Sequence, residues 1–160
     1  MIIANVGFRS KELLGLKVGE ISEGEGWDEK KKKTHIVMKV RKENSKTGKG
    51  RLCVAPVKER VQKVIKHYKE LGIKLDKTDY LFMNPTSKTR KNYGRMIMYN
   101  RLKQVFRESG LQNEFDKENK NVSLYSFRHQ YACWRLRFGD VPIHLLAKQM
   151  GTSVSKIEST

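Results

Sequence analysis

Three basic side chains in this chain have the residue types and the settings that chemistry on a phosphate diester requires. Arg9 precedes a predicted short helix, Lys46 lies on the tip of a predicted β-hairpin, and Arg128 lies just inside a later helix. Two guanidinium groups can each clamp phosphate oxygens through paired hydrogen bonds, and an ammonium group can protonate a leaving oxygen. The alternative for each residue is a solvated surface cation, so the surrounding elements must decide between the two.

The segment around Arg128 predicts a helix whose first turn faces an anion. Ser123 is the predicted N-cap. An apolar stripe at helical spacing follows and consists of Phe127, Tyr131, Trp134 and Phe138. Backbone N–H groups at a helix start, together with a guanidinium, suit a phosphate. The other interpretation is an arginine on the solvated side of an amphipathic helix.

Residues 34–41 and 51–56 predict two strands of a β-hairpin, because both have strand composition and a turn-rich segment, 43–50, separates them. The tip carries Lys46 and Lys49. Such a tip can reach into a groove or over a reacting group. The alternative is an exposed turn whose lysines only keep the protein hydrated.

The remaining elements predicted from hydrophobic spacing are mostly helices. They cover 2–6, 10–16, 57–71, 93–109, 142–150 and a last helix after Ser153, with a weak strand and loop at 18–28 and loops at 73–92 and 111–121. The residues expected to face inward from 57–71 and 93–109 include Ile65, Leu71, Met96, Ile97, Leu102, Val105 and Phe106. Six or seven helices around one small antiparallel sheet predict a mainly α fold with an α+β element.

The charge balance points to a polyanionic partner, and to nucleic acid rather than a membrane surface. Lys and Arg number 34 against 17 Asp and Glu, a formal net charge of +17. Residues 88–107 contain no acid and seven cations, namely Lys88, Arg90, Lys91, Arg95, Arg101, Lys103 and Arg107. This run predicts a face for the DNA backbone, with a merely solvated face as the alternative, and Lys49 on the hairpin tip is also predicted to bind DNA. The same two alternatives apply to the lysines at 30–33.

Several protein classes lack support in the sequence. No apolar run is long enough to span a bilayer, and no secretory signal is present. Cys53 and Cys133 lie in apolar segments and are expected to be buried free thiols of an intracellular protein. Two cysteines and four scattered histidines have no zinc-ligand spacing, and there is no P-loop. We therefore expect neither a metal nor another cofactor.

Four segments, in this order, resemble the boxes of the catalytic domain of tyrosine recombinases, the phage integrase family. They are Gly7-Phe8-Arg9-Ser10-Lys11-Glu12-Leu13-Leu14-Gly15-Leu16, Ser45-Lys46-Thr47-Gly48, Tyr125-Ser126-Phe127-Arg128-His129, and 146–153. The resemblance covers nearly the whole chain and implies that family's fold. It also implies that Arg9 and Arg128 bind the scissile phosphate. Lys46 would be the general acid for the 5′-hydroxyl leaving group.

The chain departs from the family pattern at three places. Tyr125 stands where the second box usually opens with histidine, and Thr152 stands where histidine or tryptophan is usual. A phenol or a hydroxyl can still hydrogen-bond a phosphate oxygen. The nucleophilic tyrosine is expected roughly nine residues after Thr152, which is just past Thr160. His129 is implied to brace the site, with an ordinary histidine near a helix start as the alternative.

The resemblance implies DNA strand breakage and rejoining through a 3′-phosphotyrosyl intermediate, in the integration or excision of phage or other mobile DNA. The partner is double-stranded DNA, bound by a full-length homotetramer in the cytoplasm, at the nucleoid of a bacterial or phage-infected cell. Residues 1–160 are expected to be one catalytic domain cut at both ends, lacking the N-terminal core-binding domain and the nucleophile, and hence inactive. The alternatives are a non-catalytic DNA-binding module derived from an integrase, or a general basic nucleic-acid-binding domain.

Overall fold

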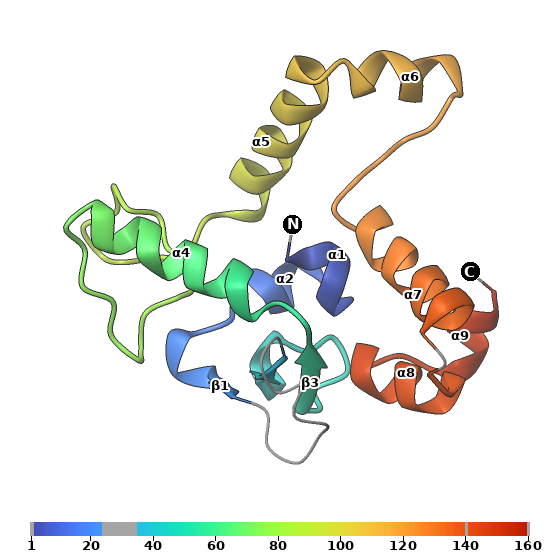
Figure 1. The fold of residues 1–160 in the computed structure, drawn as a ribbon, viewed down its shortest axis with the longest axis horizontal. Helices are drawn as coiled ribbons and strands as arrows, with labels where there is room; N and C mark the ends of the chain where they lie inside the picture. The colour runs from blue at the N-terminus through green and yellow to red at the C-terminus, as the bar shows by residue number, and fades with distance from the viewer. Residues whose placement is uncertain (1, 24–34, 140, 160) are drawn as a thin grey trace.

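The computed structural model of the protein describes residues 2–23, 35–139 and 141–159. A small sheet lies at the centre, with helices packed around it and a second group of helices at the C-terminal end (Figure 1). The lysine run at 30–33 and Asp140 lie outside the described residues.

The sheet has three strands in the order β1 (Ile21–Glu23), β2 (Ile36–Val40) and β3 (Arg51–Ala55), each antiparallel to its neighbour. The predicted hairpin is confirmed, because β2 and β3 pair along their whole length. Alternate side chains of β2 are buried, as expected for a strand with one face on the core. A short 3-10 turn, η2 (Lys42–Asn44), begins the hairpin tip.

Helices make up most of the remaining regular structure. Those in the described part of the chain are α1 (Ile3–Val6), α2 (Ser10–Leu14), α4 (Lys58–Glu70), α5 (Arg95–Glu108), α6 (Leu111–Lys117), α7 (Ser126–Phe138), α8 (Ile143–Met150) and α9 (Val154–Glu158), with one more 3-10 turn, η1 (Val18–Glu20). The predicted fold class, helices around one small antiparallel sheet, is confirmed. The described helices exceed the expected six or seven because α6 falls in a predicted loop.

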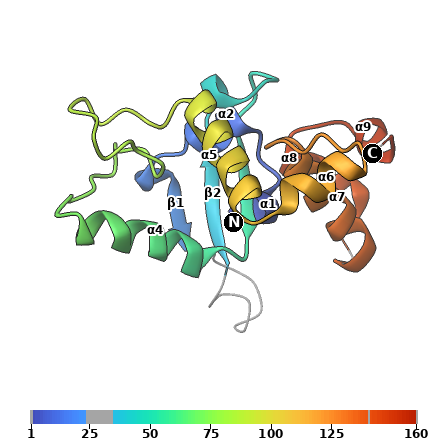
Figure 2. The same cartoon turned by 90° about the horizontal axis from the view of Figure 1, so that it is seen from above.

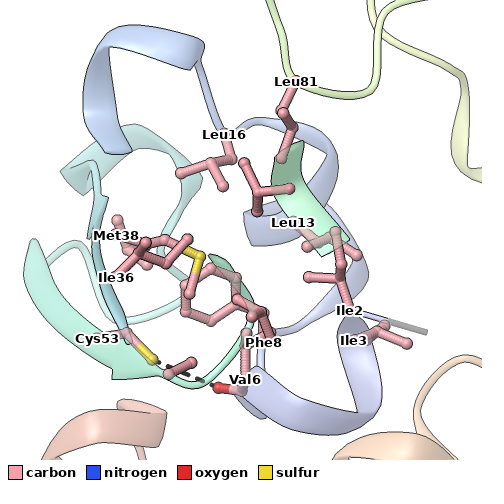
Figure 3. Close-up of a cluster of buried hydrophobic side chains, with 14 residues drawn as sticks. Ile2, Ile3, Val6, Phe8, Leu13, Leu16, Ile36, Met38, Cys53 and Leu81 are labelled. Atoms are coloured by element: carbon pink, nitrogen blue, oxygen red, sulfur yellow. Dashed lines mark hydrogen bonds between the residues drawn. The ribbon is translucent and has the colours of Figure 1, made fainter. Parts of the chain in front are cut away.

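Two apolar clusters hold the fold together. The larger one joins α1, α2, the sheet and the start of α4, and Phe8, Leu16 and Met38 are fully enclosed in it (Figure 3). Full burial of each such side chain contributes about 1.5–3 kcal/mol. The smaller cluster joins α7, α8 and α9 around Tyr131 and Leu146. The clusters meet where α1 contacts α7 and α8 contacts β3, and α4 lies at the opposite end of the molecule from α7–α9 (Figure 2).

The predicted loop over 111–121 is wrong, because most of it forms α6. The Gln112 amide donates to Asp116 Oδ1 at 2.7 Å, one turn along the helix. Phe115 packs edge-on against Phe106 of α5, with ring centroids 5.1 Å apart. Because α6 packs only on the end of α5, it needs few apolar residues. The helical spacing of apolar residues in 111–117 is therefore too weak to predict a helix from the sequence.

The apolar faces of α4, α5 and α7 are less buried than predicted. Leu102, Phe106 and Tyr131 are buried as expected. The side chains that are instead exposed are Ile65, Leu71, Met96, Ile97, Val105, Trp134 and Phe138. The physical reason for α5 is that it stands away from the sheet, so only one stripe of it meets the rest of the protein (Figure 1). Both described cysteines are free thiols as expected, but Cys133 is exposed and only Cys53 is buried.

Ser123 does not cap α7 as predicted. Tyr125 occupies the cap position, and the Ser123 hydroxyl accepts a hydrogen bond from the Tyr125 backbone N–H at 3.2 Å. The Ser123 N–H in turn donates to Ser126 Oγ at 3.0 Å. These bonds fix the turn before α7 and leave the Tyr125 ring at the surface. Ser153 does cap α9, accepting from the Lys156 N–H at 3.3 Å.

Gly7 ends α1 in the left-handed conformation, with φ +63°, and a Cβ there would lie 2.4 Å from a ring carbon of Tyr131. We expect Gly7→Ala to lower the free energy of unfolding by about 2–4 kcal/mol, because left-handed strain and overpacking add. Gly72 has φ +73° but open space around it, so Gly72→Ala should lower the free energy of unfolding by only about 1–2 kcal/mol. Urea unfolding measures both values. Equal losses would show that the Tyr131 ring moves aside freely.

Candidate active site

A groove of about 1730 Å³ is lined by β3, α8 and the end of α7. The hairpin tip, Arg9 before α2, Tyr125 before α7 and the turn after α8 also line it. Four of the residues predicted to be catalytic line it, namely Arg9, Lys46, Tyr125 and Thr152. Lys49, predicted to bind DNA, lines it too. The structure thus brings together side chains from four segments spread over most of the chain.

Arg128 lies beside this groove rather than in its wall. It is only 3% exposed and lines an adjoining hollow of about 320 Å³, together with His129. Tyr125 and Thr152 line both hollows, so the two share a wall. Arg9 is close enough to Arg128 to lower its pKa by charge repulsion. The five residues predicted to be catalytic therefore line one two-part depression.

The Arg128 guanidinium ties two distant turns together. Its Nη1 donates to the Gly7 carbonyl at the end of α1, and its Nη2 donates to the Met150 carbonyl at the end of α8, at 2.9 Å. Burial, and then the nearby charge of Arg9, lower the pKa of Arg128 to about 10. The group is therefore still cationic at neutral pH. An arginine has five N–H donors, so donors remain for a phosphate.

Three consecutive carbonyls at the end of α8 accept hydrogen bonds from three different arginines. The pairs are Arg51 Nε with Gln149 O at 2.8 Å, Arg128 Nη2 with Met150 O at 2.9 Å, and Arg9 Nη2 with Gly151 O at 3.0 Å. The last carbonyls of a helix lack partners within the helix and carry partial negative charge. The end of α8 therefore anchors the guanidinium groups, and Thr152 directly follows it.

Glu12 is a buried carboxylate between two of these arginines, only 1% exposed. It accepts from the Arg9 backbone N–H at 2.8 Å and from Arg9 Nη1 at 3.0 Å. Arg51 donates to its two oxygens, from Nη1 at 3.0 Å and from Nη2 at 2.8 Å. Burial alone would raise the pKa of Glu12, but hydrogen bonds from Arg51 and the Arg9 amide outweigh burial and hold the pKa below its usual range.

Sequence reasoning missed both Glu12 and Arg51. A signal for Glu12 exists in its spacing, since an acid three residues after the cap position Arg9 is a helix-start pattern. Arg51 carries no comparable signal. It is the first residue of a strand, and only the folded chain shows which carboxylate it meets.

The lowered pKa of Glu12 makes a prediction about acid stability. A carboxyl whose pKa is depressed in the folded state stabilises the protein above its unfolded pKa of about 4.3, and that stabilisation is lost as pH falls through the folded pKa. Glu12→Gln should therefore flatten the fall of unfolding free energy below about pH 5. Urea unfolding between pH 3 and 7 measures it, with the exposed Glu70→Gln as control. An unchanged slope in Glu12→Gln would contradict the ion-pair account.

Lys46 is exposed on the hairpin tip, and the base of the tip is anchored. Ser45 is buried, and the turn closes at Gly48, which has φ +66°. Behind it, the Asn44 amide donates to the Gly15 carbonyl at 3.0 Å. A Cβ on Gly15 would lie 2.4 Å from Asn44, so this contact requires glycine. The lysine is thus free to move while the loop beneath it is held.

Tyr125 and His129 lie one turn apart at the start of α7. Their rings meet edge-on, with centroids 4.7 Å apart, and both side chains are exposed. Thr152 is half-buried and its N–H donates to the Ala147 carbonyl at 3.0 Å. The hydroxyls of Tyr125 and Thr152 can each donate one hydrogen bond to an anion in the depression.

The cations of the 88–107 run lie on the loop before α5 and on α5, and none of the seven lines the groove. Arg90 is tied into its own loop, donating to the buried Asp79 at 2.6 Å. On α5, Arg101 lies over the Tyr93 ring and Lys103 over the Tyr99 ring. Lys88, Lys91 and Arg95 are exposed. A DNA-backbone face here stays a prediction, separate from the groove.

Within the described ranges, no three His, Cys, Asp or Glu side chains gather as a metal site would need. No helix among the described residues is both long and apolar enough to cross a membrane.

Three solved structures of recombinases have the same fold as this chain. The XerH site-specific recombinase bound to palindromic difH substrate, a post-cleavage complex, matches with TM-score 0.67 and 18% identity over 98% of this chain and 39% of that chain. The XerA recombinase matches with TM-score 0.65 and 24% identity over 98% and 48%. The pre-cleavage XerH complex with difH matches with TM-score 0.67 and 19% identity over 98% and 40%.

These comparisons confirm the resemblance to tyrosine recombinases as a likeness of fold. The chain spans less than half the length of the solved structures that it matches. No protein-family model matches the sequence, and no curated protein matches it either.

Proposed function

We propose that this chain is the catalytic domain of a site-specific DNA recombinase that cuts and rejoins strands through a 3′-phosphotyrosyl intermediate. The observation that carries the proposal is the gathering of Arg9, Lys46, Tyr125 and Thr152 around one groove, with Arg128 in the adjoining hollow. The fold supports it, since the similar XerH structures are complexes with a DNA substrate before and after cleavage.

The proposed reaction places one phosphodiester in the depression. Arg9 and Arg128 bind its non-bridging oxygens and offset the charge that builds up in the transition state. A tyrosine beyond Thr160 attacks phosphorus, forming the P–O(tyrosine) bond and releasing its proton to solvent, while the P–O5′ bond breaks. Lys46 gives a proton to the departing 5′-oxygen, and rejoining runs these steps in reverse.

Double-stranded DNA is the proposed partner, and the net charge of +17 supports that choice. We infer that the full-length protein works as a homotetramer on DNA, in the cytoplasm at the nucleoid. The integration or excision of phage or other mobile DNA is the process we infer for it.

A second candidate function is a DNA-binding module that occupies sites without cutting them. Two residues favour it. Tyr125 stands where tyrosine recombinases usually have histidine, and Thr152 stands where they usually have histidine or tryptophan. An imidazole can exchange protons near neutral pH, whereas a threonine hydroxyl can only donate or accept a hydrogen bond.

The two candidates differ in one measurement, the formation of a covalent adduct on a nicked duplex that traps the cleaved state. We expect the full-length protein to form the adduct and the chain 1–160 to form none, because we propose that the nucleophilic tyrosine lies beyond Thr160. Duplex binding without an adduct from the full-length protein would favour the second candidate. An adduct on the chain 1–160 would place the nucleophile inside it.

A further inference from the structure

We propose that Arg51 is a positioning residue for the phosphate-binding arginines, acting through the buried carboxylate of Glu12 and through the end of α8. The inference rests on the proposed recombinase function and adds to it a residue that the resemblance does not supply. Arg51 begins β3, directly after the hairpin tip, and its side chain is only 8% exposed.

All three nitrogens of the Arg51 guanidinium donate to protein acceptors. Nη1 and Nη2 bind the two oxygens of Glu12 at 3.0 and 2.8 Å, and Nε binds the Gln149 carbonyl at 2.8 Å. The guanidinium also lies 5.7 Å from the centroid of the buried Phe8 ring. A side chain held on every nitrogen is not arranged to swing onto a substrate, so its effect must pass through the groups it holds.

The first such group is Glu12, and the effect is one of charge. Arg9, Arg51 and Glu12 together carry a net charge of +1, which is available to a phosphate at Arg9. Without Arg51, Glu12 would have Arg9 as its cation in this cluster, and that pair is neutral. Arg9 would then be held by a buried carboxylate instead of facing the phosphate, because an unpaired buried charge is very costly.

The second group is the turn after α8. Gly151 has φ +65°, and a Cβ there would lie 2.7 Å from Arg51 Nη1. The close approach of this turn to Arg51 therefore requires glycine. The same turn supplies the carbonyls that bind Arg9 and Arg128, and it carries Thr152. Arg51 thus sets both the net charge around Arg9 and the position of the turn after α8 that holds Arg9 and Arg128.

The chain offers a matched control in Arg41, which follows β2 on the other side of the same hairpin tip. It forms ion pairs with Glu20 at 2.5 Å and Glu43 at 2.7 Å, and donates to the Gly15 carbonyl at 3.0 Å. Within the described part of the chain these ion pairs and hydrogen bonds reach neither Glu12 nor α8. Its removal therefore breaks a comparable set of ion pairs without touching the clamp.

The test compares cleavage by the full-length protein on two nicked duplexes, one ordinary and one with an uncharged methylphosphonate at the scissile position. Arg51→Met should slow cleavage of the ordinary duplex by about 10²-fold, the size of effect seen when one charge-stabilising donor is lost. It should slow the methylphosphonate duplex far less, because the methyl group removes one negative charge that the arginines would otherwise have to offset. Arg41→Met should change both rates by the same factor.

A double variant tests the charge argument itself. In Arg51→Met/Glu12→Gln the positive charge of Arg9 is no longer cancelled, so cleavage of the ordinary duplex should recover relative to Arg51→Met alone. This arm also serves if Arg51→Met alone folds poorly, because the double variant removes the buried carboxylate that has lost its hydrogen bonds from Arg51. Arg51→Lys, which keeps the charge but not the paired hydrogen bonds, should fall between Arg51→Met and the parent.

Equal slowing of both duplexes in Arg51→Met, or no recovery in the double variant, would overturn the positioning role while leaving the recombinase function in place. Absence of any adduct from the parent protein would overturn the recombinase function, and the role of Arg51 with it.

Discussion

Lys46→Ala in the full-length protein should slow DNA cleavage by about 10²–10⁴-fold, the contribution of a positioned general acid. Duplex affinity should stay within about two-fold, because one exposed lysine is a small share of many phosphate contacts. The physical reason is that an alkoxide is a poor leaving group unless it is protonated as its bond breaks. Lys46 is exposed on an anchored tip at the groove, where it can reach a bound phosphate. Single-turnover cleavage measures the rate.

A substrate with sulfur in place of the bridging 5′-oxygen identifies the step that Lys46 serves. A thiolate leaves without a proton, so sulfur should restore most of the rate in Lys46→Ala. It should not restore the rate in Arg128→Ala, where the phosphate clamp is missing. Lys49→Ala is the matched control, since Lys49 lines the same groove and should behave almost like the parent. If sulfur instead rescues Lys49→Ala, Lys49 is the general acid. If sulfur rescues neither lysine variant, the general acid does not lie on the hairpin.

The affinity of the chain 1–160 for duplex DNA should fall by about 10³–10⁵ between about 50 and 200 mM salt. Each phosphate that a cation neutralises releases condensed counterions, and added salt opposes that release. The +17 charge predicts many such contacts, and with them little preference for sequence. Fluorescence anisotropy on two unrelated duplexes measures both properties. A flat response to salt would contradict binding through the phosphate backbone.

Charge reversal locates the face that DNA contacts. Arg95→Glu with Arg101→Glu changes the acid-free run on α5, and Arg60→Glu with Lys63→Glu makes the same change of charge on exposed positions of α4. If the 88–107 run meets DNA, the α5 pair should weaken binding much more and should reduce the salt slope. Equal losses from both pairs would leave the run as an ordinary solvated surface.

The sequence by itself determined the features that local chemistry controls. The turn-rich segment between two strand-like runs predicted the hairpin that carries Lys46, and β2 and β3 confirm it. Glycines at 7 and 151 end their helices in the left-handed conformation, as residues after a helix often do. Arg9 and Arg128 could be predicted as a pair from the sequence because each lies at a helix start. In the structure both line the two-part depression.

Only the tertiary structure decided which groups hold those arginines. Arg51 reaches Glu12 across 39 residues of sequence, and Arg9 reaches the Gly151 carbonyl across 142. Tertiary packing also decided that the outer faces of α5 and α7 stay exposed and that α6 forms although it makes few apolar contacts. Helix starts and turns depend on hydrogen bonds between near neighbours, which a sequence displays directly. A buried ion pair depends on which distant segments meet, and its partners share no spacing that a sequence can show.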